Sequence, residues 1–225
     1  MTEVLERRAT PRPVTFRAAP EGASGPGTLS GYAAVFNTLS RDLGGWCEEI
    51  APTAFGPAGP LNMDTHTRVL ARAEHESELL LGTTNAGTLR CTVDEIGLFY
   101  EVDLPDTNAG RDVAVLAERG DYAFSSFAFY TLPDGRTWRE DENGLLVSVV
   151  TAARLVDVAP VADPAYWASS ATVSRSIDLE EVRASLHPEP APPGAFETAA
   201  AERAAVIQSS LAKRASGRRT RLGGR

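Results

Sequence analysis

Short runs that alternate apolar and polar residues fill most of the chain between residues 14 and 174, and turn-forming residues separate them. Such alternation is typical of β-strands, because successive side chains of a strand point to opposite faces. The runs predict strands at residues 14–18, 31–36, 46–50, 88–93, 98–104, 123–132, 145–151 and 154–160. Their spacing favours an antiparallel sheet, with hairpin turns at Asp134-Gly135 and Asn143-Gly144.

A helix is indicated by the run TNAGRDVAVLAERG, residues 107–120. Thr107 or Asn108 can cap its start, Val113 and nearby apolar residues share one face, and Gly120 can end it in the left-handed conformation. We therefore predict an α+β fold, mainly antiparallel β: a barrel-like sheet surrounded by helices such as that at 109–119. Closure of the sheet would remove its exposed edges.

The two ends of the chain differ in character from the middle. We assign residues 1–13 to an N-terminal tail and 14–176 to the folded domain. Residues 177–225 combine a short polar helix, which begins near residue 176, with the proline-rich spacer HPEPAPPGAF, an alanine-rich helix and a basic tail. Proline-rich segments are extended and an alanine face adds little to a core, so this region is interpreted as linker and tail.

Composition excludes several classes of function. The net charge of −8 would repel a phosphate backbone, and six basic residues lie in the tail 213–225, so a nucleic-acid partner is not expected. Cys47 and Cys91 are too few for a disulfide framework and match no zinc-ligand spacing. The sequence lacks the motifs of phosphate, dinucleotide and metal sites and the apolar runs of signal peptides and membrane spans. We expect a soluble, cytoplasmic protein without cofactor, metal or membrane partner.

The run GDYAFSSFAF, residues 120–129, places two serines inside an aromatic strand where no turn explains them. Strand alternation puts Ser126 on the face opposite Phe127 and Phe129, so that Ser126 can face a substrate while Ser125 faces the core. A serine becomes a nucleophile when a base takes its proton, and histidine is the natural base near neutral pH.

Three histidines are available as that base. His187 lies in the proline-rich spacer and His66 in a polar connection, whereas His75 lies between two apolar runs, which predicts a place at the edge of the core. Asp157 is an acid inside an apolar strand, and it requires a donor partner because an unpaired buried carboxylate is costly. His75 is a candidate for that partner, and Asp157 would then orient the imidazole.

Each of these residues also has a simpler interpretation. Ser126 can be a small residue tolerated in a strand, and His75 a histidine at a strand edge. Asp157 can cap a turn or pair with Arg154. A cysteine nucleophile is a further alternative, although neither cysteine lies near an activating cation or helix terminus. The chain order His, Ser, Asp also differs from the orders of the common serine hydrolases.

Several ordered motifs together carry a resemblance to a known family: GYAAVFN, EEIAPTAF, AEHESELLLGTT, GLFYEVDLPDT, RGDYAFSSFAF and LVDVAPVADPAY. In order and spacing they resemble the prohead (procapsid) maturation proteases of tailed bacteriophages, which in turn resemble the herpesvirus assemblin proteases in fold. The resemblance covers roughly residues 14–176 and implies a serine endopeptidase. Its histidine falls on His75, its nucleophile on Ser126 and its acid on Asp157. Thr53 and Ala159 depart from the family, which often has glycine and serine there.

The resemblance also implies the partners and the place of action. Its substrates would be the scaffolding segment of the major capsid protein and the protease itself, inside the immature prohead in the host cytoplasm. Whether the enzyme forms a homodimer stays open. The alternative, from a different class, is a catalytically silent capsid assembly or scaffolding factor that binds capsid protein through its sheet and helical tail.

Overall fold

Three β-sheets make up most of the computed structural model, which describes residues 4–10, 12–163 and 177–187. In this part of the chain the strand orders are β1-β10-β13-β6-β7, β2-β3-β9-β8-β5 and β11-β12-β4. The elements named below all belong to one compact unit, residues 1–186.

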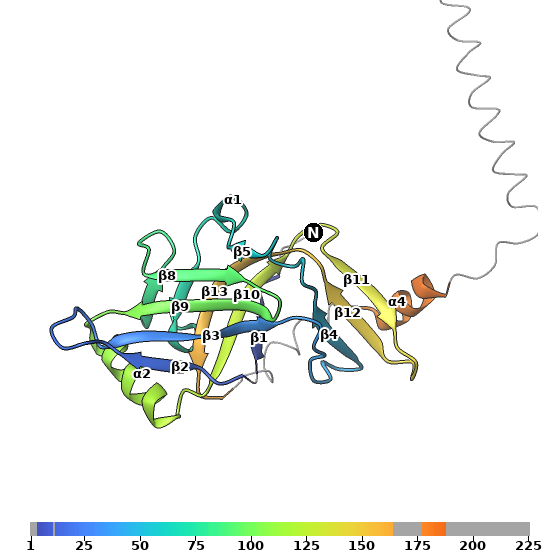
Figure 1. Cartoon of the computed structure of the whole chain (residues 1–225). Helices are drawn as coiled ribbons and strands as arrows, with labels where there is room; N and C mark the ends of the chain where they lie inside the picture. The colour runs from blue at the N-terminus through green and yellow to red at the C-terminus, as the bar shows by residue number, and fades with distance from the viewer. Residues whose placement is uncertain (1–3, 11, 164–176, 188–225) are drawn as a thin grey trace, which may run out of the picture. The chain divides into compact units, whose positions relative to one another are not determined.

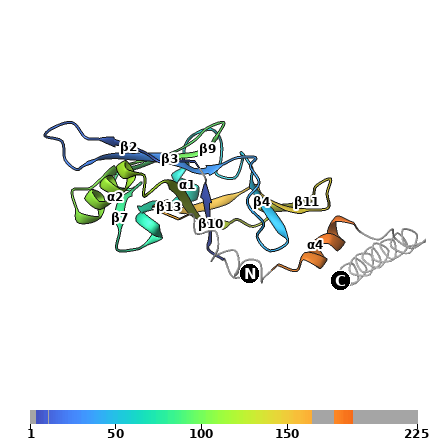
Figure 2. The same cartoon turned by 90° about the horizontal axis from the view of Figure 1, so that it is seen from below.

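The first two sheets pack against each other, as two layers in Figures 1 and 2. The first sheet contains β1 (Glu6–Thr10), β10 (Phe124–Thr131), β13 (Ala153–Val161), β6 (Leu70–Arg72) and β7 (Leu80–Thr83). The second contains β2 (Thr15–Ala18), β3 (Gly27–Val35), β9 (Gly97–Leu104), β8 (Leu89–Val93) and β5 (Gly59–Pro60). Phe127 and Phe129 of one layer meet Tyr100 and Val102 of the other in a shared apolar core. Removing these side chains from water is the main force that holds the layers together.

Helix α2 (Asn108–Arg119) covers one end of these layers beside β2 (Figure 1). The Thr107 hydroxyl accepts a hydrogen bond from the Gly110 N–H at 3.3 Å, and Gly120 ends the helix in the left-handed conformation with φ 84°. Val113 is buried against the main core. The predicted helix and both of its predicted end signals are therefore confirmed.

The third sheet has a small core of its own. It contains β11 (Arg136–Glu140), β12 (Leu146–Val150) and β4 (Trp46–Ile50), and α4 (Leu179–Leu186) lies beside β11. Trp46 and Leu146 are fully buried there, and Val182 of α4 packs against them. Arg183 of α4 also donates to Glu140 of β11 at 2.9 Å. Two short helical turns, α1 (Met63–His66) and η1 (Ala73–His75), complete the described elements.

The α+β class and the mainly antiparallel arrangement are confirmed, but the described strands do not close into the predicted barrel. The edge strand β1 of the first sheet does approach β3 of the second sheet. Their link, however, is a side-chain bond from the Thr10 hydroxyl to the Ala33 carbonyl at 2.6 Å, and not a backbone ladder. The pairs β13–β6 and β12–β4 are parallel, which alternating patterns did not predict.

Two local predictions need correction. The turn at Asn143-Gly144 joins the paired strands β11 and β12, as predicted. Asp134-Gly135 also forms a turn, but the strands β10 and β11 on either side belong to different sheets, so a hairpin there is wrong. The segment predicted as an N-terminal tail contains β1, which pairs with β10. Its inward side chains are Glu6, Arg8 and Thr10, so the strand shows no apolar alternation.

The predicted proline-rich spacer lies outside the described residues apart from His187, and the alanine-rich helix and basic tail lie outside them entirely. Among the described helices, none combines the length and the apolar character needed to cross a membrane.

Candidate active site

The two serines of β10 point to opposite faces of the first sheet. Ser125 is fully buried in the core, with its hydroxyl 3.1 Å from that of Tyr100. Ser126 faces the other side, paired with Ala9 of β1 and Ala159 of β13. Both residues that pair with Ser126 on the neighbouring strands are thus alanines, whose side chains are single methyl groups.

A β-bulge directs Asp157 toward the same face. The register of β10 and β13 shifts between Ala128 and Phe129: Ala128 pairs with Asp157, whereas Phe129 pairs with Leu155. Val156 is therefore an extra residue in β13, and the side chains after it point to the opposite faces from those that regular alternation would give them. Without the shift, Asp157 would share the core face of Leu155, two positions earlier.

His75 reaches this face from a strained turn after β6. Strand β6 lies beside β13, with Leu70 opposite Asp157. Glu74 and His75 then adopt left-handed backbone conformations, with φ of 53° and 61°. The turn is held by a bond from the Ala73 N–H to the Leu79 carbonyl at 3.1 Å. The Glu74 carboxylate also accepts from the Ala162 N–H, just beyond β13, at 2.8 Å. These bonds offset the cost of a conformation that favours glycine.

The three predicted site residues are brought together by adjacent strands. His75 Nε2 lies 2.7 Å from Ser126 Oγ, and His75 Nδ1 lies 2.6 Å from Asp157 Oδ1. Exposed fractions are 6% for Ser126, 9% for His75 and 1% for Asp157. Since an ionised carboxylate only accepts hydrogen bonds, Nδ1 carries the proton toward Asp157 and Nε2 can accept the serine proton. Such an arrangement can serve as a nucleophile, a base and an orienting acid.

Asp157 has a second ionic partner, Arg72, the last residue of β6. Arg72 Nη2 donates to Asp157 Oδ2, so the two carboxylate oxygens serve different groups. Arg154, the partner considered from the sequence, lies over the ring of Tyr130, 4.7 Å from its centroid.

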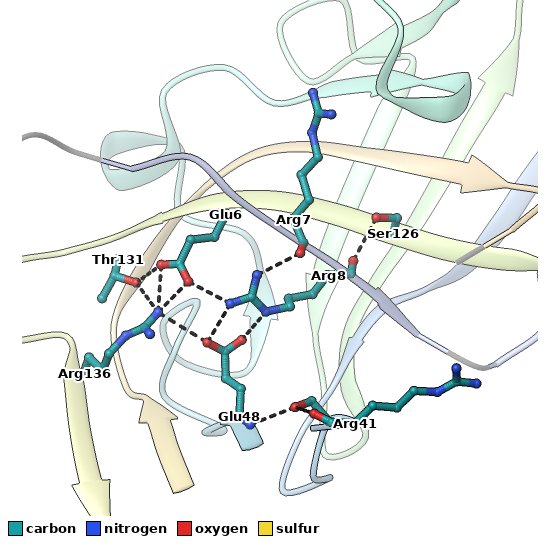
Figure 3. A network of polar contacts seen from close by, with 9 residues as sticks. Glu6, Arg7, Arg8, Arg41, Glu48, Ser126, Thr131 and Arg136 are labelled. Carbon is teal, nitrogen blue, oxygen red and sulfur yellow. Dashed lines mark hydrogen bonds and ion pairs between the residues drawn. The ribbon is translucent and has the colours of Figure 1, made fainter. Parts of the chain in front are cut away.

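Strand β1 also touches Ser126. The Ser126 hydroxyl can donate to the Arg8 carbonyl at 2.9 Å (Figure 3). The hydroxyl has a single hydrogen, so it donates either to this carbonyl or to His75 Nε2 at one time.

Buried charges fix the position of β1. The Arg8 side chain donates to Glu48 at 2.7 and 3.0 Å and to Glu6 at 2.8 Å, and Arg136 reaches the same two carboxylates (Figure 3). Burial raises the pKa of Glu48, and the guanidinium groups of Arg8 and Arg136 oppose that shift. A slip by one residue would expose Arg8 and bury Arg7, so the cluster also fixes the register of β1.

His66 and the two cysteines take no part in these contacts. His66 is buried and structural: its Nδ1 accepts from the Leu155 N–H at 3.0 Å, and its Nε2 lies 3.3 Å from the Phe55 carbonyl. Burial raises the pKa of Cys91 to about 12 and also raises that of Cys47, so both are thiols at neutral pH. Within the described ranges, no cluster of three metal-ligating side chains occurs.

Sequence reasoning missed Arg72, Glu74 and the Arg8 carbonyl. A signal for Arg72 was present, because a cation stands three residues before His75 while the buried Asp157 needs a charged partner. No comparable signal marked the Arg8 carbonyl, since backbone groups carry no sequence information.

One of three comparisons with known proteins found a match. A family model described as caudovirus prohead serine protease matches residues 14–183. A search of curated proteins and a search of solved structures each found no match. The matched range contains His75, Ser126 and Asp157 but begins after β1.

Proposed function

This chain belongs to the caudovirus prohead serine protease family, and from that premise we propose that Ser126, His75 and Asp157 form its catalytic triad. Ser126 attacks the carbonyl carbon of a peptide bond while His75 Nε2 takes its proton. The proton then passes to the departing amine, which leaves an acyl-enzyme on Ser126. Water, deprotonated by His75, releases the acyl group, and Asp157 holds the imidazole in the required tautomer.

One observation carries this proposal: the imidazole lies between the hydroxyl and the carboxylate, at 2.7 and 2.6 Å. Both distances are within hydrogen-bond reach, as proton transfer requires. The His, Ser, Asp order along the chain does not weaken the proposal, because such triads are recognised by geometry and not by sequence position.

The proposed substrates are the scaffolding segment of the major capsid protein and the protease itself, cut inside the immature prohead. Proteolysis confined to a closed shell would act on capsid segments at high local concentration, and on the exposed tails of neighbouring protease molecules. A fold like that of the herpesvirus assemblin proteases is part of the same proposal, and the layered antiparallel sheets support it.

The test compares Ser126→Ala with Ser125→Ala, a matched control on the core face of the same strand. A fluorophosphonate probe reports the nucleophile: Oγ bonds to phosphorus, fluoride leaves, and His75 takes the proton. We expect labelling of the wild type and of Ser125→Ala, but none of Ser126→Ala. On co-expression with the phage's major capsid protein, the wild type and Ser125→Ala should process it, and Ser126→Ala should not.

Capsid processing that is unchanged in Ser126→Ala or in His75→Ala would refute the triad. A wild-type protein that neither reacts with the probe nor cuts capsid protein would indicate the silent assembly factor instead. Mass spectrometry of the concentrated wild-type protein, with Ser126→Ala beside it, tests autocleavage.

A further inference from the structure

Arg72 connects the acid of the site to the turn that carries His75. Its Nη2 donates to Asp157 Oδ2, and its Nη1 donates to the Ser77 hydroxyl at 3.3 Å. Residues 72 and 77 flank the strained turn at positions 74 and 75. The guanidinium therefore contacts both the carboxylate and the loop on the far side of His75.

The burial of Asp157 requires a cation beside it. Its side chain is 1% exposed, and within the described part of the chain it pairs with His75 and Arg72. A neutral imidazole supplies a hydrogen bond but no charge, and His75 must be neutral to act as a base. Arg72, whose side chain is 15% exposed, therefore supplies the positive charge beside the buried carboxylate in the resting site.

Asp157 binds Arg72 with one carboxylate oxygen and His75 with the other, and this fixes the orientation of its carboxylate. With Oδ2 held by Arg72, Oδ1 is the atom that faces His75 Nδ1. A carboxylate without that second bond could rotate and present either oxygen, or move away from the imidazole. Misplacement of a catalytic group by about 1 Å can cost about a hundredfold in rate.

We infer that Arg72 is a positioning residue, which supplies the counter-charge to Asp157 and aims its carboxylate at His75; the inference rests on the proposed triad. Arg72 acts through Asp157, and its side chain bonds to Asp157 and Ser77. The site then comprises four residues: Arg72, Asp157 and Ser126 on the adjacent strands β6, β13 and β10, and His75 in the turn after β6.

The test measures the rate constant of fluorophosphonate labelling from pH 5.5 to 9 in the full-length protein. We expect Arg72→Gln, which keeps donors but loses charge, to react about tenfold to a hundredfold more slowly at pH 7. The acid limb of its pH–rate profile should move to higher pH, because loss of a positive charge beside the site makes uptake of a proton there less unfavourable.

The charged groups around His75 come from several elements, and the variant changes only one of them. Asp157 lies on β13, Arg72 on β6, and Glu74 in the turn itself, where Ala162 N–H holds its carboxylate.

Arg72→Lys, which keeps the charge but loses the fork of donors, should retain the wild-type acid limb with a reduced rate. Methylguanidinium should restore part of the rate to Arg72→Ala.

Arg90→Gln is the matched control, because Arg90 forms an exposed pair with Asp103 in the second sheet. It should label at the wild-type rate with the wild-type acid limb. A folded Arg72→Gln that does the same would overturn the inference while leaving the triad intact. If Arg72→Gln does not fold, an acid limb in Arg72→Lys that moves upward would overturn it instead. Labelling of Ser126→Ala would refute the triad itself.

Discussion

His75 and Glu74 are two consecutive non-glycine residues with positive φ, 61° and 53°. Such conformations cost about 1–3 kcal/mol each and persist only where surrounding contacts enforce them. Here those contacts come from Leu79 and from Ala162, outside the turn itself. The cost is incurred at the residue that must face both a hydroxyl and a carboxylate, which supports its proposed role as the base.

Asp157→Asn tests the orienting acid with almost no change of shape. An amide cannot hold the imidazole in the tautomer that leaves Nε2 free, so we expect labelling to slow by about 10⁴-fold, the loss known for this change in other triads. The measurement is the fluorophosphonate rate constant at pH 7. Asp103→Asn, which also removes an acid paired with an arginine, should react normally. A rate within about threefold of wild type for Asp157→Asn would exclude Asp157 from the triad.

Strand β1 is held in place by charges instead of apolar side chains. The side chains of Glu6 and Arg8 are 6% and 3% exposed, and both belong to the cluster shared with β4 and β11. Buried ion pairs add little net stability compared with apolar packing, but removal of one member is costly. The cluster therefore specifies one register for β1, which keeps the Arg8 carbonyl beside Ser126.

Glu48→Gln should destabilise the protein by about 3 kcal/mol, because it leaves Arg8 without its bidentate acceptor in a buried site. The free energy of unfolding in urea measures this loss. Relative to the wild type, the substitution should speed up hydrogen exchange more in β1 than in β9, which lies in the other layer. The double variant Arg8→Met/Glu48→Met is the control: it removes one cation and one anion and keeps the pair of Glu6 with Arg136. The double variant should be more stable than Glu48→Gln, and the reverse order would contradict the proposed anchor.

At the scale of the whole molecule, a neutral histidine links segments far apart in the chain. His66, at the end of α1, accepts from Leu155 of β13 and lies against the Phe55 carbonyl. Burial lowers the pKa of His66, so the folded state favours the uncharged ring. Its hydrogen bond to the Leu155 N–H also requires an unprotonated Nδ1.

The free energy of unfolding should therefore fall as the pH falls below about 6.5, the ordinary value of an unfolded histidine. Below that pH the unfolded chain binds a proton that folded His66 resists, so stability present at higher pH is lost. One such proton contributes at most about 1.4 kcal/mol per pH unit. Urea denaturation at pH 7.5 and 5.5 measures the slope.

His66→Asn, whose amide oxygen can still accept from Leu155, should show a shallower slope between those two pH values. His187→Asn is the control, since His187 is exposed and its replacement should leave the slope unchanged. A slope in His66→Asn equal to that of the wild type would assign the acid sensitivity to other groups.

Local rules in the sequence were enough for the parts of the molecule that depend on near neighbours. Helix α2 begins at a capping threonine and ends at a left-handed glycine because those bonds form within a few residues. Ser126 and Ser125 take opposite faces because strand geometry alone separates adjacent side chains. Strand β4 lies at residues 46–50, where alternation predicted it.

Contacts between distant segments decided the rest. Strand β1 carries a buried pattern of charged residues that becomes favourable only beside Glu48 and Arg136, 40 and more positions away. Arg72 and Asp157 are 85 positions apart, and a bulge whose phase no local pattern reveals turns Asp157 toward the serine. The layers remain separate sheets because side chains, and not a backbone ladder, join β1 to β3. Alternation and capping are short-range effects readable from the chain, whereas register, bulges and charge pairing are set by which strands meet.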